Sequence, residues 1–132
     1  MIGLDPIPQL SRLRPEHTFL QLKNGPKAQH CFSLHRISQV IGRSQPPYDQ
    51  VDIDLGPCEL EGTPMISRRH ALMEWHDGQL NICDLNSRNG TWVDGQPLKS
   101  QQPGEPSPFM PLAAGSQVKL GNLEMEVIIN EH

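Results

Sequence analysis

The sequence predicts an all-β fold, a sandwich of two β-sheets built from short strands. Its 132 residues include 13 prolines and 11 glycines, a composition that suits many short elements joined by turns. No stretch of ten or more residues keeps the apolar period of an amphipathic helix. Instead, short runs alternate apolar and polar side chains between turn formers, as half-buried strands do. The length is that of one domain with a real core.

The first 16 residues, MIGLDPIPQLSRLRPE, are predicted to be a proline-rich arm or linker. Pro6, Pro8 and Pro15 block a regular helix and bias their neighbours toward extended backbone. The domain itself is predicted to span residues 17–130.

Strands are indicated wherever apolar side chains alternate with polar ones. Leu20 and Leu22 alternate with polar neighbours, and Leu123 and Met125 begin a run with one buried and one wet face. The predicted strands lie in TFLQLKN, RISQVIGR, VDIDL, RHALMEW, QLNICDL, TWV and LEMEVII.

Tight turns separate several of these runs. The dipeptides Asp77-Gly78, Asn89-Gly90 and Asp94-Gly95 suit the positive φ angles of hairpin turns. Their spacing predicts an antiparallel meander. Residues 99–111, KSQQPGEPSPFMP, contain four prolines and are predicted to form a long, mobile loop.

Charge and composition exclude several classes of function. The formal net charge is −4, so we expect no nucleic-acid partner, which would need a broad basic field. The three cysteines form no CxxC pair, so neither a disulfide framework, a metal site nor a cofactor is expected. No apolar run approaches the ~18 residues of a membrane span. We therefore expect a soluble, cytoplasmic protein without membrane insertion.

Three segments that are separate in the sequence each offer arginine, hydroxyl or amide groups. Arg43 follows a strand and a glycine in VIGR, Ser67 and Arg68 precede a strand in ISRRH, and Arg88 and Asn89 stand in the turn NSRNGTW. Each segment alone suits an ordinary charged turn. Together they are candidates for a local anion site.

The order GR, then SxxH, then (S/T)xNGT resembles the pattern of forkhead-associated (FHA) domains. The resemblance covers about residues 18–130, and its core runs from Gly42 to Gly95. It implies an antiparallel β-sandwich of about eleven strands. It also implies that loops at one end of this sandwich grip a phosphothreonine in an extended peptide.

The resemblance implies a role for each candidate residue. Arg43 would be the main phosphate contact, because a planar guanidinium meets two phosphate oxygens at once. Ser67 would donate its hydroxyl, Arg68 would reach phosphate or peptide backbone, and Asn89 would hold the peptide main chain through its amide. Arg88 departs from the family pattern, and either strengthens phosphate capture or faces solvent.

Other residues are expected to support or tune the site. Gly42, His70 and Gly90 are expected to be structural, with the His70 ring bonded to backbone behind the loop. Met65 and Ile66 stand where the family commonly reads the side chain three places after the phosphothreonine. Because they are apolar, they favour an aliphatic residue at +3 over aspartate. The alternative is that Met65 packs under the loop and leaves +3 unread.

We therefore expect a phosphothreonine-dependent peptide-binding module that recruits partners in Ser/Thr kinase signalling. Its partner would be a phosphothreonine-containing protein, either a Ser/Thr kinase or a kinase substrate. The alternative is a phosphate-independent scaffold or oligomerisation sandwich. An enzyme is not expected, because the sequence shows no paired carboxylates at strand ends and no nucleophile with a base.

Overall fold

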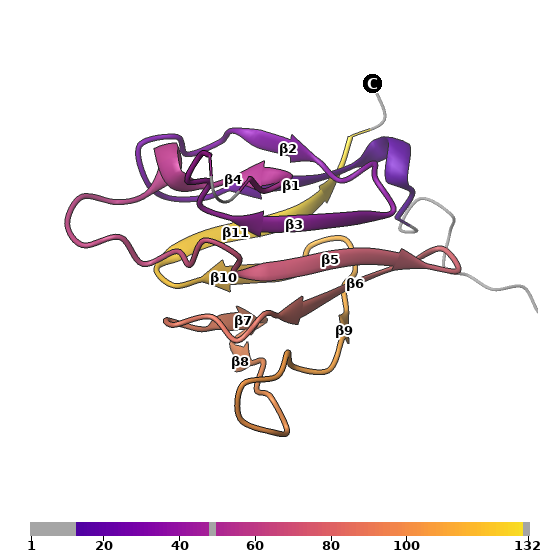
Figure 1. Ribbon diagram of the computed structural model, residues 1–132. Helices are drawn as coiled ribbons and strands as arrows, with labels where there is room; N and C mark the ends of the chain where they lie inside the picture. Colours follow the sequence, from indigo (N-terminus) through magenta and orange to yellow (C-terminus); the bar gives the residue numbers. More distant parts are fainter. Residues whose placement is uncertain (1–12, 48–49, 131–132) are drawn as a thin grey trace, which may run out of the picture.

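Two β-sheets packed face to face make up the protein (Figure 1). The computed structural model describes residues 13–47 and 50–130. Their eleven strands confirm the predicted all-β sandwich. The strands are β1 (Thr18–Leu22), β2 (Cys31–Ser33), β3 (Ser38–Gly42), β4 (Ile53–Asp54), β5 (Ala71–His76), β6 (Gln79–Asp84), β7 (Thr91–Val93), β8 (Gln96–Pro97), β9 (Met110–Pro111), β10 (Gln117–Leu120) and β11 (Leu123–Ile129). The described residues also include short 3-10 helices at Pro15–His17 and Gly56–Cys58.

The strand order departs from a simple meander. One sheet has the order β2-β1-β11-β10-β7-β8 and the other β4-β3-β5-β6-β9. The hairpin of β5 and β6 is as predicted, with φ angles of 51° at Asp77 and 81° at Gly78. The prediction that the chain continues as a meander is wrong, because β7 pairs with β10 in the opposite sheet. Local turn dipeptides do not encode that crossover. In addition, β3 and β4 pair in parallel.

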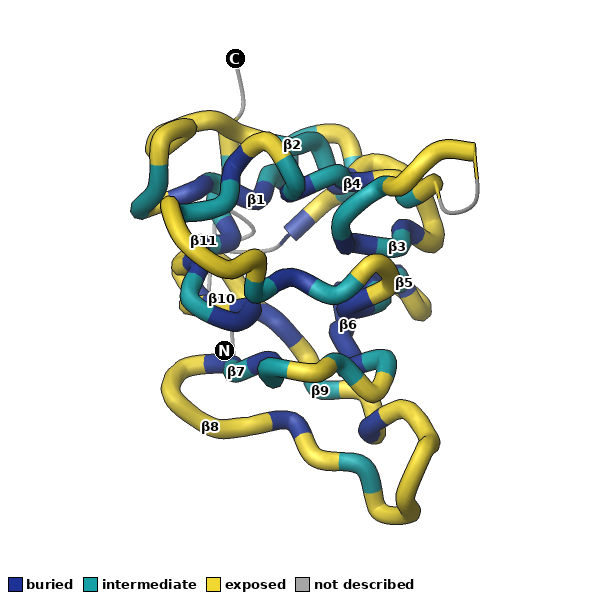
Figure 2. The backbone as a smooth tube through the Cα atoms, turned by 60° about the vertical axis from the view of Figure 1, so that its left-hand side comes forward, coloured by how far each residue is buried: buried dark blue, intermediate teal, exposed yellow. Residues whose placement is uncertain are grey.

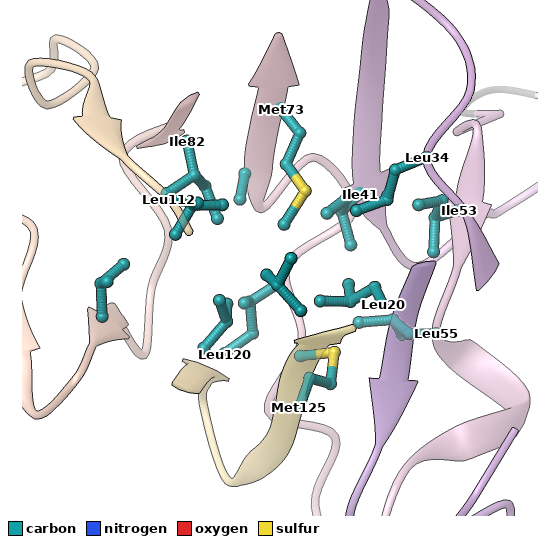
Figure 3. Packing of buried hydrophobic residues seen from close by; sticks show 14 of the residues in the cluster. Leu20, Leu34, Ile41, Ile53, Leu55, Met73, Ile82, Leu112, Leu120 and Met125 are labelled. Atoms are coloured by element: carbon teal, nitrogen blue, oxygen red, sulfur yellow. The ribbon is translucent and has the colours of Figure 1, made fainter. Parts of the chain in front are cut away.

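The hydrophobic core lies between the two sheets. Leu20, Leu120 and Met125 from the six-stranded sheet lie opposite Met73 and Ile82 from the five-stranded sheet, as Figure 3 shows. All five side chains are at most 2% exposed. Burial of each such side chain is worth about 1.5–3 kcal/mol, so the core gives the loops at its ends a rigid frame.

The predicted N-terminal arm falls mostly on residues 1–12, which lie outside the described residues. In the described part, Leu13 is 8% exposed and belongs to the core. Leu13 therefore packs against the domain, although it lies in the segment that was predicted to be an arm.

The predicted loop 99–111 has two different halves. Residues 101–106 are exposed (Figure 2). Ser107 is buried, its N–H donates to the Asp84 carbonyl at 2.9 Å, and its Oγ accepts the Asp84 N–H at 2.8 Å. The chain then forms β9, which pairs with β6. The irregular loop is thus shorter than the sequence predicts, because Ser107 is hydrogen-bonded to Asp84 at the end of β6.

Cys31, Cys58 and Cys83 are all free. In the part of the chain that the structure describes, no helix has the length and apolar character to cross a membrane. Residues 13–47 and 50–130 also contain no group of three or more His, Cys, Asp or Glu side chains suited to holding a metal ion.

Candidate functional site

Three segments meet at one end of the sandwich, on the left of Figure 1: the chain after β3, the chain before β5 and the turn before β7. They line an open cleft of about 450 Å³. Its lining residues are Arg43, Pro64, Met65, Ile66, Ser67, Arg68, Arg69, Arg88 and Asn89. Four of these are arginines and none is acidic. A chain with a net charge of −4 therefore concentrates positive charge here.

Close packing at Gly42 brings the first two segments together. A Cβ atom at Gly42 would lie 2.0 Å from the Arg68 carbonyl oxygen, so no other residue fits. The next residue, Arg43, shares its backbone N–H between the Ser67 and Arg68 carbonyls, both at 3.1 Å. The glycine thus allows the chain to cross directly over the Ser67-Arg68 backbone.

The Arg43 side chain is held at the base of the cleft. Its Nε donates to the Ile66 carbonyl at 3.2 Å. Neither terminal Nη group bonds to another described residue, although both carry donors. The guanidinium is therefore oriented by protein and has its fork of donors available for an anion.

Ser67 joins the second segment to the third. Its Oγ accepts the Arg88 N–H at 3.0 Å. Because that bond uses a lone pair of the hydroxyl, the Ser67 proton remains available to a ligand in the cleft.

His70 lies behind the cleft and is fully buried. Its Nδ1 accepts the Ser67 N–H at 3.0 Å, so the proton of the neutral ring is on Nε2, which donates to the Gly90 carbonyl at 2.9 Å. Burial lowers the pKa of His70, and the Gly90 carbonyl, Asp84 and Glu59 oppose this only in part. A neutral imidazole thus bridges the two loops that carry Ser67 and Asn89.

Asn89 contacts the segment that precedes Ser67. Its Nδ2 donates to the Met65 carbonyl at 2.9 Å. The Oδ1 atom bonds to no other described residue, so it can accept from a ligand main-chain N–H. Asn89 and Met65 both line the cleft.

The structure separates the two candidate specificity residues. Met65 is half-buried and lines the cleft. Ile66 is 2% exposed and packs in the core, so it meets the cleft through its backbone. Of the two side chains, Met65 alone is placed where it can touch a ligand.

Arg88 and Arg68 are exposed and line the cleft. The structure thus brings all seven residues that were predicted to bind or select a peptide to one opening, with Ile66 present through its main chain. Gly42 and His70 lie beneath it. Gly90 has a φ of 93°, and a Cβ there would lie 2.8 Å from the Trp92 ring.

Sequence reasoning missed Asp84, which organises the turn before β7. Asp84 is 7% exposed and accepts the Ser87 N–H at 2.9 Å, the Ser87 hydroxyl at 2.5 Å and the Thr91 hydroxyl at 2.7 Å. The Ser87 Oγ in turn accepts the Gly90 N–H at 3.0 Å. An aspartate three residues before a serine in a turn is the signal that could have identified it.

Glu59 and Arg69 were also missed. The Glu59 carboxylate accepts the Met65 N–H at 2.9 Å and the Ile66 N–H at 3.4 Å, which closes the loop that presents Met65. No local pattern reveals this contact, because the partners lie six and seven residues away. Arg69 lines the cleft beside Arg68, whereas its sequence context indicates only a charged turn.

Comparison with known proteins agrees with this architecture. The FHA domain family model matches residues 39–121. The chain is 30% identical over 109 residues to the oxoglutarate dehydrogenase inhibitor of Corynebacterium diphtheriae, a match that covers 83% of this chain and 63% of that protein. It is 33% identical over 114 residues to the FHA domain-containing protein FhaA of Mycobacterium tuberculosis, a match that covers 86% of this chain and 17% of FhaA. This chain therefore corresponds to only part of each relative.

A solved structure from a study of phosphothreonine-dependent FHA domain interactions has a TM-score of 0.64 and 28% identity, and the match covers 88% of this chain and 99% of that one. The match to the family model spans most of the sandwich and includes the three segments of the cleft. The chain belongs to the FHA domain family.

Proposed function

We propose that the chain is a phosphothreonine-dependent peptide-binding module that recruits partners in Ser/Thr kinase signalling. The observation that carries this proposal is the convergence of oriented polar groups on a cleft whose described lining residues include no acidic one: the Arg43 guanidinium, the Ser67 hydroxyl and the Asn89 amide. A phosphothreonine brings about −1.5 to −2 charges and three acceptor oxygens. The positive charge and the N–H and O–H donors of the cleft thus suit the negative charge and the acceptor oxygens of the phosphate.

The arrangement suits recognition of a phosphate on an extended peptide. Arg43 would bind two phosphate oxygens, because its Nε is already fixed on the Ile66 carbonyl and its Nη groups are available. Ser67 would donate its hydroxyl to a third oxygen. Asn89 would accept a main-chain N–H of the peptide, a contact that is independent of the peptide's side chains.

The Met65 side chain supports selectivity for an aliphatic residue at +3. Its backbone is held by Glu59 and Asn89, while its side chain lines the cleft. A flexible thioether adapts to an apolar guest, whereas an aspartate placed against it would lose water without gaining a partner. An oriented phosphothreonine library should therefore enrich isoleucine, leucine or valine at +3. Enrichment of aspartate, or an unchanged profile for Met65→Arg, would contradict this role.

The partner of such a module would be a phosphothreonine-containing protein, a Ser/Thr kinase or one of its substrates. The relatives are described as an inhibitor and an FHA domain-containing protein, which fits a binding module without catalytic groups. A cytoplasmic location is part of this proposal and is supported by the three free cysteines.

The test is fluorescence polarisation with one degenerate peptide pool in phosphorylated and unphosphorylated form. A few charge-assisted contacts to a flexible peptide should give a dissociation constant on the order of micromolar for the phosphorylated pool. Arg43→Ala should abolish measurable binding while the melting temperature stays close to that of the parent.

Arg36→Ala is the matched control for charge. Arg36 is exposed, pairs with Asp52 at 3.4 Å and does not line the cleft, so this variant should bind like the parent. Equal binding of the two pools would instead support the phosphate-independent scaffold. Parent-like binding by a folded Arg43→Ala variant would place the phosphate elsewhere.

A further inference from the structure

Thr63 carries a hydroxyl that the fold leaves unused. Among the serines and threonines of the described residues, only Ser38 and Thr63 are exposed. The Ser38 hydroxyl donates to the Glu74 carboxylate at 2.9 Å, whereas the Thr63 hydroxyl bonds to no other described residue. The remaining threonines, Thr18 and Thr91, are at most 1% exposed. Thr63 is thus the accessible and unbonded threonine in the part of the chain that the structure describes.

The surroundings of Thr63 leave room for a second protein. Residues 61–64 are all exposed and belong to the loop that projects at the left of Figure 1. A Cβ atom added at Gly62 would meet no atom within 4 Å. Pro64 follows Thr63, and a threonine followed by proline is the acceptor that proline-directed Ser/Thr kinases use. The loop therefore presents a kinase acceptor in open space.

The chain contains a second dipeptide of this kind, Ser107-Pro108, which the fold protects. Ser107 is 6% exposed. Its Oγ accepts the Asp84 N–H at 2.8 Å and donates to the Pro108 carbonyl at 3.0 Å. The two dipeptides are equivalent in the sequence, but only the hydroxyl of Thr63 is open to a kinase in the folded protein.

Thr63 stands directly beside the lining of the cleft. Pro64 and Met65 both line it, and successive Cα atoms are about 3.8 Å apart. The Met65 backbone is fixed, because its N–H donates to Glu59 and its carbonyl accepts from Asn89, both at 2.9 Å. A phosphate on Thr63 is therefore tethered to the rim of the cleft.

The distance from this rim to the expected ligand phosphate is short. Thr63 is three residues from Ile66, whose carbonyl accepts the Arg43 Nε. Three residue steps span at most about 11 Å. A phosphate on Thr63 and a ligand phosphate on Arg43 would therefore lie about 10–15 Å apart. At low salt, two dianions repel each other over such a distance.

We propose that Thr63 is a phosphorylation site whose phosphate weakens peptide binding by the adjacent cleft. The inference rests on the proposed function, because it gives that site a regulator. A Ser/Thr kinase would transfer the γ-phosphoryl group of ATP to the Thr63 Oγ1. The new P–O bond replaces the bond to the leaving oxygen of ADP, and the hydroxyl proton passes to the catalytic aspartate of the kinase. The loop then carries about −1.5 to −2 further charges, two residues beyond the exposed Glu61.

The phosphorylated loop is not itself a ligand for a second copy of the chain. If Thr63 were the bound phosphothreonine, the +3 residue would be Ile66. Ile66 is 2% exposed, its N–H donates to Glu59 and its carbonyl accepts from Arg43. The folded protein therefore cannot offer residues 63–66 to another cleft as an extended peptide. The phosphate acts on the cleft of its own chain.

The first measurement tests Thr63 as an acceptor. The folded protein is incubated with ATP and a purified proline-directed Ser/Thr kinase, and the phosphorylated residues are identified by mass spectrometry. Phosphate should appear on Thr63 and be absent from Ser107. In the Thr63→Val variant, this label should disappear. An unlabelled Thr63 in the parent, or labelling of Ser107 to the same extent, would overturn the assignment.

The second measurement compares unmodified protein with protein that carries a phosphate on Thr63, introduced by semisynthesis. Each is titrated by calorimetry with one phosphothreonine peptide that has isoleucine at +3. Repulsion over about 10–15 Å should weaken binding by about three- to tenfold at low salt. At about 1 M salt, where the Debye length is about 3 Å, the two affinities should become nearly equal. Thr63→Val should bind like the unmodified protein at both salt concentrations.

The outcomes separate this inference from the proposed function. If the unmodified protein binds no phosphothreonine peptide, the proposed function fails. If it binds, but phosphate on Thr63 leaves the affinity at low salt unchanged, the regulator is refuted while the phosphothreonine module stands. A loss of the same size at both salt concentrations would also refute it. Self-association of the phosphorylated protein in analytical ultracentrifugation would overturn the inference as well, because Thr63 would then be a ligand for another copy.

Discussion

Two loops of this sandwich, 59–70 and 99–106, contain proline or glycine and have few buried residues, yet they are organised in opposite ways. In the first, Arg43 donates to the Ile66 carbonyl, Asn89 donates to the Met65 carbonyl, and the Arg88 N–H donates to the Ser67 hydroxyl oxygen. In the second, the side-chain bonds join Ser100 and Gln102, two neighbours within the loop. The first loop is connected to other segments, and the second to itself.

This difference explains why one loop forms a site and the other does not. A binding surface requires donors whose positions are fixed before the ligand arrives. At the cleft, buried or half-buried side chains from neighbouring segments satisfy the loop backbone, which leaves the Arg43 and Ser67 donors directed outward. Loop composition alone does not distinguish the two cases.

The largest expected effect is at Gly42, compared with Gly104 in the exposed loop. Gly42→Ala would place a methyl group 2.0 Å from the Arg68 carbonyl oxygen. Backbone must then move, so we expect a loss of about 3 kcal/mol in the free energy of unfolding together with loss of peptide binding. Urea denaturation and fluorescence polarisation measure the two effects.

Gly104→Ala is the matched control. Gly104 has a φ of 81°, and a Cβ added there would have no atom within 4 Å, so the cost is the left-handed backbone alone, about 1 kcal/mol. Peptide affinity should be unchanged. Equal losses of binding at both glycines would remove the distinction between the loops.

A smaller effect is expected at Asp84, compared with Ser100. Asp84→Asn would turn an amide donor toward hydroxyl and N–H donors of Ser87 and Thr91, which should cost about 2 kcal/mol. Because the turn carries Arg88 and Asn89, peptide binding should weaken as well. Ser100→Ala removes a bond within the exposed loop and should change neither quantity. A fully active Asp84→Asn variant would show that the turn does not need this carboxylate.

The contrast between the loops also explains what the sequence could predict. Strand positions followed from alternation, as at β5 and β11, and GR, SxxH and (S/T)xNGT marked the three segments of the cleft. Glu59 gave no signal because its partners are backbone groups, which carry no residue identity. Asp84 bonds to the side chains of Ser87 and Thr91, in the turn where the chain crosses to the other sheet. The sequence does not reveal this crossover, so it did not reveal the role of Asp84. Ile66 and Met65 are both apolar and looked equivalent in the sequence. Only the packing of the sheets beneath the loop determines that Ile66 is buried and Met65 lines the cleft.

The smallest expected effect is a pH dependence of stability that originates at His70. Burial lowers the pKa of His70 in the folded protein, against the partial opposition of the Gly90 carbonyl, Asp84 and Glu59. Below the unfolded pKa of about 6.5, the unfolded chain takes up a proton that the folded ring refuses. The stability from the neutral ring is thus present above that pH and is lost as pH falls toward the lowered pKa, by at most about 1.4 kcal/mol per pH unit.

Urea denaturation at about pH 7.5 and about pH 5.5, which bracket the unfolded pKa, measures this loss. His70→Gln keeps a polar side chain that does not titrate, so its stability should change less between the two conditions. Subtracting the two proteins removes the contribution of the other histidines. Equal pH dependence in both would show that His70 can accept a proton without breaking its bonds to Ser67 and Gly90.

The most direct test of the account is an amide chemical-shift titration of the labelled protein with a phosphothreonine peptide and its unphosphorylated counterpart. The phosphopeptide should shift the amides of Arg43, Ser67, Arg88 and Asn89, and leave those of residues 101–106 unchanged, while the unphosphorylated peptide should shift neither group. Shifts centred on the exposed loop or on a sheet face, or equal shifts with both peptides, would contradict a phosphate-dependent site at this end of the sandwich.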